Sequence, residues 1–264
     1  MSVINTLRER IELYEEPTKL KLMKKLPVIT VVNGRSFKKA TSLLTKPFDP
    51  AFMEIMCGTM IKLAQEIDGT VLGYLFNDEV IVVSRNDQTN DTEAYYDNKV
   101  QKIVSATSSI ATLELNRLAK QNDVSLFGDP IFTAKTFVVP NITEVINLLI
   151  HFQQRAFHTA LWNASFYELL KKYDIETVKK MLLNRSAEEK AEILYAERDI
   201  SFNSYPLPFR RGVLTYRKPQ RVASSDEGEI FKNKLHIDME IPLFTKEHEF
   251  LGDIFSGRGI IRAK

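Results

Sequence analysis

The sequence predicts an α+β protein with a ferredoxin-like β-α-β-β-α-β core and an appended helical region. The chain has 264 residues and is 44% hydrophobic, which is enough for one or two domains with a buried core. Apolar runs typical of strands alternate with helical periodicity up to residue 140 in that order. From residue 141 onward the composition favours helix. We therefore expect one unit over residues 1–140 and a second over residues 141–264.

Four apolar runs supply the predicted strands of the first unit. Residues 26–32 are almost continuously apolar and β-branched, which is typical of a central strand buried on both faces. Residues 70–75 and 80–83 predict a hairpin with its turn at 76–79. Residues 132–139 predict the last strand, which Pro-Asn ends.

Two predicted helices connect these strands. The first begins at 47–49 and ends at Asp68-Gly69, and its apolar residues recur at steps of three and four, which forms one apolar face. The second covers residues 93–119, after a polar loop at 86–92. Its predicted buried face consists of Val100, Ile103, Val104, Ile110 and Leu113.

The second unit begins with one long helix or two helices over residues 142–172. We expect its aromatic side chains, Phe152, Phe157, Trp162, Phe166 and Tyr167, to form core rather than a base-stacking platform. A capping box at Ser186 and Glu189 predicts the start of a further helix. The remaining predictions are a helix over 174–183, irregular structure over 201–208, strands over 210–216 and 232–242, and a polar linker over 218–228, with 243–264 unassigned.

Composition limits the classes of function. The formal net charge of +2 is too small to identify a nucleic-acid partner. The single cysteine, Cys57, excludes an intrachain disulfide and a thiolate metal site, and fits a reducing compartment. The N-terminus lacks the apolar core of a signal peptide, and no apolar run is long enough to span a bilayer. We therefore expect a cytoplasmic protein without a membrane partner.

Polar residues gather where the predicted strands end. Asn33 and Gly34 close the first strand, and Asn77-Asp78-Glu79 lies at the hairpin turn. Carboxylate and amide oxygens are ligands that Mg²⁺ prefers, and glycine allows a phosphate to approach the backbone closely. This arrangement suits a nucleotide and a divalent metal. We find no Ser-His-Asp or Cys-His nucleophile set, dinucleotide fingerprint or Walker loop.

Six short motifs resemble, in their order along the chain, those of the tRNA-histidine guanylyltransferase family, the 3′-to-5′ nucleotide-adding polymerases. They are Asn33-Gly34-Arg35-Ser36-Phe37, Lys46-Pro47-Phe48-Asp49, Asn77-Asp78-Glu79-Val80, Leu161-Trp162-Asn163-Ala164-Ser165-Phe166-Tyr167, Lys190-Ala191-Glu192-Ile193-Leu194-Tyr195 and Arg210-Arg211-Gly212. The resemblance covers roughly residues 26–218 and implies a polymerase palm.

The resemblance also implies the site and the reaction, in which nucleotides are added to the 5′ end of a tRNA or related RNA. Two Mg²⁺ ions per site would be held by Asn33, Gly34 and Asp78, with Asp78 and Glu79 as the catalytic acids. GTP or ATP would be the substrate. The implied nucleotide-binding residues are Asn33, Gly34, Arg35, Ser36, Phe37, Lys38, Asn77, Asp78, Lys99 and Lys190, the last two through triphosphates. Arg210 and Arg211 would contact RNA, and a homotetramer is implied.

Three departures from the family pattern leave alternatives open. Asn33 stands where the family has aspartate, which removes one metal-binding charge. In the helix after the hairpin only Lys99 remains of three basic residues, and His158 is displaced by one position, about 100° around a helix. The last change indicates relatives that repair truncated tRNA 5′ ends rather than selectors of histidine tRNA. The alternatives are a degenerate palm that binds nucleotide or RNA without turnover, and a palm-type cyclase.

Overall fold

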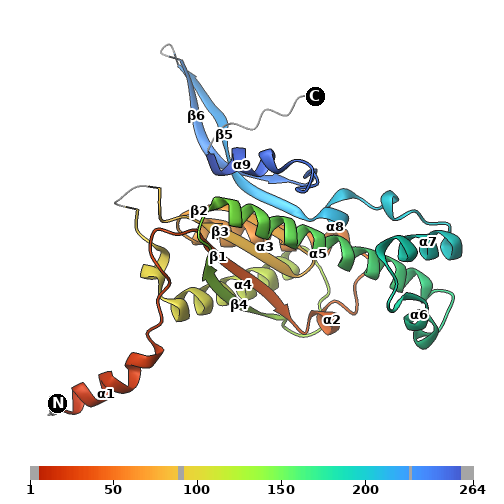
Figure 1. Ribbon diagram of the computed structural model, residues 1–264, viewed down its shortest axis with the longest axis horizontal. Helices are drawn as coiled ribbons and strands as arrows, with labels where there is room; N and C mark the ends of the chain where they lie inside the picture. The colour runs from red at the N-terminus through yellow and green to blue at the C-terminus, as the bar shows by residue number, and fades with distance from the viewer. Residues whose placement is uncertain (1–5, 89–91, 226–227, 257–264) are drawn as a thin grey trace.

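The computed structural model describes residues 6–88, 92–225 and 228–256, and its centre is one antiparallel sheet (Figure 1). The strand order is β4-β1-β3-β2-β5-β6. The strands are β1 Val28–Arg35, β2 Thr70–Phe76, β3 Glu79–Ser84, β4 Ile131–Val138, β5 Val213–Ser225 and β6 Gly228–Asp238. The first four strands and the two helices between them follow the predicted β-α-β-β-α-β order, so the predicted fold class is confirmed.

Two layers of helix cover the two faces of the sheet. On one face lie α3 (Pro50–Glu66) and α4 (Val100–Gln121), which pack on strand residues such as Val32 and Val82. On the other face α5 (Ile142–Leu169) and α9 (His248–Ser256) pack on Val31. Neighbouring residues of β1 therefore face opposite layers, as the period of a strand requires. The continuous apolarity of the predicted first strand reflects this burial on both faces.

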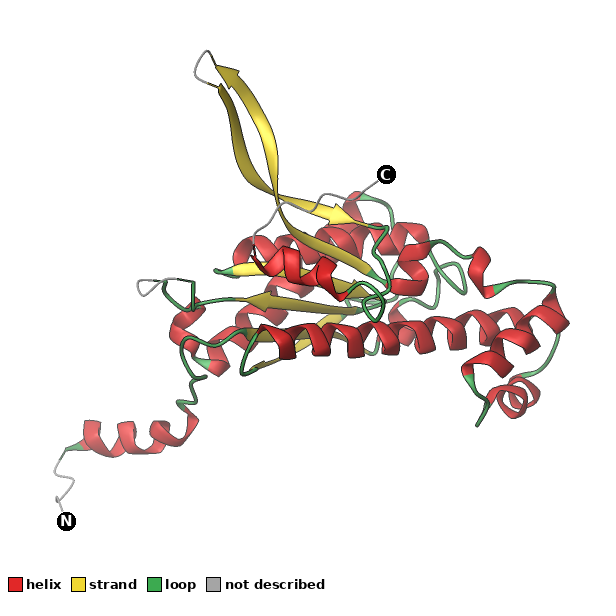
Figure 2. Ribbon diagram, turned by 45° about the horizontal axis from the view of Figure 1, so that its top comes forward, coloured by secondary structure: helices red, strands yellow, loops and turns green. Residues whose placement is uncertain are grey.

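Of the remaining helices, α1 lies at one end of the molecule, α6 and α7 lie at the other, and the short α2 and α8 lie near the sheet (Figure 1). Figure 1 shows α1 extending away from the sheet, and Figure 2 shows α5 as one continuous helix. The bounds are α1 Leu7–Glu15, α2 Phe37–Ala40, α6 Ile175–Leu182, α7 Ala187–Arg198 and α8 Leu207–Arg211, with 3₁₀ turns at Glu16–Thr18, Tyr95–Asn98 and Phe202–Ser204. The capping box of α7 is confirmed: Glu189 N–H donates to Ser186 Oγ at 3.1 Å. Within the described residues, no helix combines the length and apolarity needed to cross a membrane.

The prediction of one helix over 93–119 is wrong at its start. The α4 helix begins at Val100, and Tyr96, Asp97 and Asn98 have φ angles of 49°, 53° and 57°. Asn98 is buried and its side chain donates to Met23 O at 3.0 Å, so contacts with the distant N-terminal arm fix a non-helical backbone. Leu113, from the predicted buried face, is 72% exposed. Ile103 is buried and Ile110 packs on the core, as predicted, and the buried face also includes Thr107, Ala111 and Leu115.

The prediction of a polar linker over 218–228 is also wrong. These residues belong to a long hairpin of β5 and β6, paired from Leu214↔Asp238 to Ser225↔Gly228 with a shift of register between Arg221 and Ala223. Residues 226–227 lie outside the described part. Figure 2 shows the hairpin projecting from the body. A two-stranded ribbon is held by backbone pairing, so polar side chains do not reveal it. Of the unassigned tail, α9 joins the core and residues 257–264 lie outside the described residues.

The predicted strand over 210–216 begins only at Val213, because Arg210 and Arg211 end helix α8. Gly212 separates the two elements with a φ of 84°. A Cβ there would lie 2.6 Å from the carbonyl oxygen of Leu75, so glycine lets β5 approach β2 closely. Strand β5 then pairs with β2, which places the second half of the chain in the same sheet as the first. The polar loop predicted at 86–92 falls between β3 and α4, with residues 89–91 outside the described part.

Candidate nucleotide and metal site

The end of β1 leads into a tight turn, and at Gly34 the ring of Phe37 leaves no room for a side chain. A Cβ on Gly34 would lie 2.3 Å from the ring of Phe37. Ser36 takes a left-handed φ of 60°, and Phe37 then begins the short helix α2. The Phe37 ring packs against Phe132, with 5.0 Å between the ring centroids. The turn therefore holds the backbone after Gly34 close to the hydrophobic core.

The β2–β3 hairpin turn lies directly beside this point. Gly34 N–H donates to the carbonyl oxygen of Asp78 at 3.0 Å, and Asn33 is the cross-strand partner of Glu79. Asn77 has a left-handed φ of 49°, which asparagine tolerates well. Asn33, Gly34, Asn77, Asp78 and Glu79 are thus brought together, as predicted from the two strand ends.

Where the end of β1 meets the β2–β3 turn, which we call the corner of the site, the Asp78 carboxylate has a shifted pKa. Burial raises its pKa to about 6, and the neighbouring charge of Glu79 adds to the increase. Among the described residues, no cationic side chain lies within ion-pair distance of the Asp78 carboxylate. A largely buried carboxylate without a counter-ion is unfavourable when ionised, and a bound cation would remove that cost.

Glu79 differs from its neighbour because it already has a cationic partner. Arg155 of α5 donates from Nη2 to Glu79 Oε2 at 3.0 Å. The Glu79 side chain is 15% exposed and that of Arg155 is 51% exposed. The pair connects the hairpin to the long helix of the second unit.

A cavity of about 400 Å³ opens beside Asp78. Its walls come from the segment after β1, the start of α3, the hairpin turn, the second half of α5 and Phe209 of α8. The lining residues are Phe37, Lys38, Thr41, Leu44, Thr45, Lys46, Pro47, Phe48, Asp49, Phe52, Met53, Asn77, Asp78, Trp162, Asn163, Phe166, Tyr167, Lys179 and Phe209. Of the predicted nucleotide-binding residues, the lining includes Phe37, Lys38, Asn77 and Asp78.

The cavity combines aromatic faces with a lysine. Trp162 and Phe166 are stacked at 6.0 Å with 14° between their planes. Lys46 Nζ donates to Thr41 Oγ1 at 3.2 Å and lies 5.5 Å from the centroid of the Tyr167 ring. Burial lowers the pKa of Lys46, against the opposing charge of Asp49. Aromatic faces accept a base by stacking and an ammonium group attracts phosphate, so this cavity suits a nucleotide.

The aromatic residues of α5 were predicted to form core, and this is confirmed for part of the set. Phe152 is buried among the α5 and sheet residues, and Trp162 and Phe166 pack against a buried cluster of α5 and α6 residues. Trp162, Phe166 and Tyr167 also line the cavity, and Phe157 is 38% exposed. Residues three and four apart lie on one side of a helix, so their spacing could have indicated a common face but not what that face meets.

Several predicted residues do not line this cavity. Arg35 and Ser36 line a separate shallow groove with Lys39 and Phe127. Lys190 donates to Arg185 O at 2.5 Å and lies 5.9 Å from the centroid of the Trp162 ring. Its predicted contact with a triphosphate stays a prediction.

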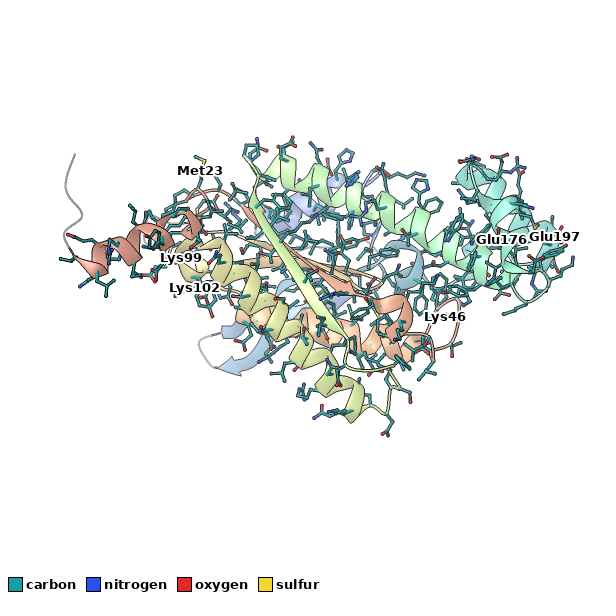
Figure 3. The ribbon with its side chains drawn as sticks, turned by 90° about the horizontal axis from the view of Figure 1, so that it is seen from below. Met23, Lys46, Lys99, Lys102, Glu176 and Glu197 are labelled. Atoms are coloured by element: carbon teal, nitrogen blue, oxygen red, sulfur yellow. The ribbon has the colours of Figure 1, made fainter. Side chains whose placement is uncertain are left out.

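Lys99 lies far from the cavity. Figure 3 shows Lys99 and Lys46 toward opposite ends of the molecule. Lys99 forms an isolated β-bridge with Lys21 of the N-terminal arm. Its predicted role at a triphosphate likewise stays a prediction, and the sequence reasoning that singled it out passed over Lys46.

The predicted RNA-binding arginines both make contacts within the chain. Arg210 Nε donates to Tyr205 O at 2.7 Å, and Arg211 Nη1 donates to Ile241 O at 3.1 Å. Tyr74 also donates to Arg211 O at 2.8 Å. These bonds position helix α8, and with it Phe209, against the sheet. Contact of the two arginines with RNA stays a prediction.

Comparison with known proteins then gives the family. A family model described as tRNAHis guanylyltransferase matches residues 8–140, and a second, described as Thg1 C terminal domain, matches residues 147–246. The chain belongs to the tRNA-histidine guanylyltransferase family. The family is one of nucleotidyltransferases, and the resemblance predicted from the ordered motifs is confirmed.

Curated relatives are similar along most of their length. A probable tRNA(His) guanylyltransferase of Drosophila melanogaster is 25% identical over 87% of this chain and 80% of the relative. The tRNA(His) guanylyltransferase of Schizosaccharomyces pombe is 25% identical over 80% of this chain and 82% of the relative.

Solved structures share the fold. A bacterial tRNA(His) guanylyltransferase (Thg1)-like protein in complex with ATP matches with a TM-score of 0.79, at 24% identity, over 95% of this chain and 99% of that one. The corresponding protein in complex with GTP gives a TM-score of 0.71 at 23% identity, over 95% and 99%. The tRNA(His) guanylyltransferase of Saccharomyces cerevisiae gives 0.68 at 18% identity, over 84% of this chain and 95% of that one.

Proposed function

We propose that this protein is a metal-dependent nucleotidyltransferase that adds nucleotides to the 5′ end of a tRNA or related RNA in the 3′-to-5′ direction. The observation that carries the proposal is the unpaired Asp78 carboxylate at the mouth of an aromatic cavity that holds Lys46. Family membership supplies the reaction class. The ATP and GTP complexes of the bacterial relatives support these two nucleotides as substrates.

The strand ends offer oxygen ligands to a divalent cation. The Asp78 carboxylate, the Gly34 carbonyl and the Asn33 amide oxygen are the hard donors that Mg²⁺ prefers, and burial raises the pKa of Asp78. These residues therefore fit such a cation. When bound, a divalent cation would stabilise the charge on the reacting phosphate oxygens.

The chain's own residues would bind and orient the nucleotide. Trp162 and Phe166 would stack against the base, and Lys46 and Lys38 would attract the phosphates. The 3′-hydroxyl of the bound nucleoside triphosphate would attack the phosphorus at the activated or triphosphorylated 5′ end of the RNA. A new phosphodiester bond forms, and the bond between that phosphorus and the bridging oxygen of the next phosphate breaks. The leaving group is a nucleoside monophosphate from an activated end or pyrophosphate from a triphosphorylated end, and the 3′-hydroxyl proton passes to solvent.

A degenerate palm that binds nucleotide without turnover remains the second candidate. Asn33 favours it, because an amide contributes no charge to a cation site. In that case the cavity would still bind nucleotide and Asn33→Asp would create activity where the natural chain has none.

A labelled-nucleotide transfer assay tests the proposal. The substrates are full-length and 5′-truncated tRNAs with GTP or ATP, each with Mg²⁺ or Mn²⁺, and the chain is compared with Asp78→Asn and Asn33→Asp. We expect label at the 5′ end with the natural chain and none with Asp78→Asn. Transfer by Asn33→Asp alone, with nucleotide still bound by the natural chain, would establish the binding-only alternative.

A further inference from the structure

Side chains from three elements lie on the α5 face of the sheet, beside the turn that carries Asp78. Asn33 of β1 and Glu79 of β3 are paired across the two strands. Alternate strand residues share a face, and Ile81 packs in the α5 layer, so Glu79 points to that layer. Arg155 of α5 completes the group through its ion pair with Glu79.

The arginine is held in place from two sides. Its two terminal nitrogens lie 3.0 and 3.4 Å from the two carboxylate oxygens of Glu79. Its guanidinium carbon lies 5.3 Å from the centroid of the Phe152 ring. A planar guanidinium fork matches a carboxylate and stacks on aromatic rings, so Arg155 balances the charge of Glu79 within the protein.

The ion pair between Arg155 and Glu79 reduces the negative charge that this part of the site can offer to metal ions. Asn33 is neutral and Glu79 is neutralised, so Asp78 supplies the only uncompensated negative charge among the described residues of this corner. In the described part of the chain, no group of three or more His, Cys, Asp or Glu side chains could hold a metal. Two divalent cations carry four positive charges, and one carboxylate offsets their mutual repulsion poorly. These residues do not fit the two ions that the family resemblance implies.

We propose that the site holds one divalent cation at Asp78, and that the Arg155 guanidinium supplies the positive charge at the Asn33–Glu79 pair in place of a second ion. The relevance of this arrangement to phosphoryl transfer rests on the proposed function. Arg155 acts as a positioning residue, since it holds Glu79 and thereby the hairpin turn that carries Asp78.

Counting bound Mn²⁺ by electron paramagnetic resonance tests the proposal on the full chain. The titration is made with Mn²⁺ alone and again with saturating GTP, whose phosphates would share the same ion. We expect one Mn²⁺ per chain at saturation in both series. The double variant Asn33→Asp/Arg155→Gln restores two carboxylates and removes the guanidinium, and we expect two Mn²⁺ per chain.

A matched control separates this effect from the loss of any arginine. Arg117 is 47% exposed and pairs with the mostly buried Glu114 on α4, away from the site. We expect Arg117→Gln to bind one Mn²⁺, as the natural chain does. A count of two or of none in the natural chain would overturn the proposal, even if the double variant does not fold. A count of one in a folded double variant would overturn it as well.

The readout distinguishes this inference from the proposed function. One bound Mn²⁺ without nucleotide transfer would contradict the proposed function and support the single-cation site. Two bound Mn²⁺ with transfer would support the proposed function and contradict the single-cation site.

Discussion

Two aspartates in similar turns of this molecule have opposite electrostatic surroundings. Asp78 follows the left-handed Asn77 in the β2–β3 turn, and Asp97 is itself left-handed in the segment before α4. Burial raises the pKa of Asp78 to about 6. Hydrogen bonds from Lys21, the larger contribution, and from Lys24 hold the pKa of Asp97 well below its usual range. The difference indicates that Asp78 has capacity for an external cation, whereas the charge of Asp97 is used within the fold.

Two lysines of the N-terminal arm, residues 16–25, form ion pairs with Asp97. Lys21 and Lys24 lie 2.5 and 2.8 Å from the two carboxylate oxygens of Asp97. Backbone bonds from Leu22 N–H to Asn98 O and from Val100 N–H to Leu20 O fix the arm against the start of α4. The two lysines therefore help to hold the arm in place.

The largest expected difference between the two aspartates is in catalysis. Among the described residues of the proposed cation site, Asp78 carries the charge that has no counter-ion. Asp78→Asn removes this charge, so we expect 5′ nucleotide transfer to fall at least about 100-fold. Asp97→Asn keeps a residue that tolerates the left-handed backbone, and we expect transfer within about twofold of the natural chain. Initial rates of label incorporation measure both. If transfer falls equally in the two variants, the two aspartates do not differ in their importance for catalysis.

The second expected difference is in the pH dependence of stability. The folded pKa of Asp78, about 6, lies above its unfolded value of about 3.9, so the folded protein binds more protons between these pH values. The free energy of unfolding of the metal-free protein should therefore fall, relative to Asp78→Asn, by roughly 2–3 kcal/mol as pH rises from about 4 to about 7.

Urea unfolding of both proteins at a series of pH values measures this difference. Saturating Mg²⁺ should offset the fall in the natural chain, because the cation compensates the ionised carboxylate. If the free energies of unfolding of the natural chain and of Asp78→Asn change with pH in parallel, the pKa of the Asp78 carboxylate is not raised by folding.

A third comparison concerns the lysines of the two regions. Lys46 lines the cavity, so we expect Lys46→Ala to raise the nucleotide Kd roughly 10-fold, in line with a hydrogen bond to a charged group. Lys99 lies in the region of Asp97, and we expect Lys99→Ala to change the Kd less than about twofold. Trp162, the chain's single tryptophan, lines the cavity and reports binding by fluorescence. A larger effect of Lys99→Ala would instead support its predicted contact with a triphosphate.

The smallest expected effect is on the stability of the Asp97 region. The folded pKa of Asp97 lies below its unfolded value, so its ion pairs stabilise the protein above the unfolded pKa and are lost as pH falls through the folded one. Since these side chains are solvent-exposed, we expect Asp97→Asn to lower the Tm at neutral pH by no more than about 3 °C. About 0.5 M salt should reduce that difference, and a calorimetric scan with and without salt measures it.

Patterns within short stretches of sequence predicted those helices and strands that such stretches specify by themselves. Apolar runs, helical periodicity and the capping box at Ser186 predicted the order of elements up to β4 and the start of α7. The corner of the site was also predictable, because Gly34 and Asp78 lie at strand ends that the antiparallel order brings to one edge of the sheet. The cavity was not, because its aromatic wall comes from α5, which follows the palm in the chain.

The sequence by itself determined the α+β class, the family and the identity of the strand-end residues, since these depend on short-range periodicity and ordered motifs. Only the tertiary structure decided the use of each charge. Lys46 lines the cavity, whereas Lys21 and Lys24 form ion pairs with Asp97. Arg155 forms an ion pair with Glu79, whereas Asp78 has no cationic partner among the described residues. Each of these outcomes depends on contacts between residues distant in the chain. Burial and charge neutralisation are set by such contacts, and no local pattern specifies them.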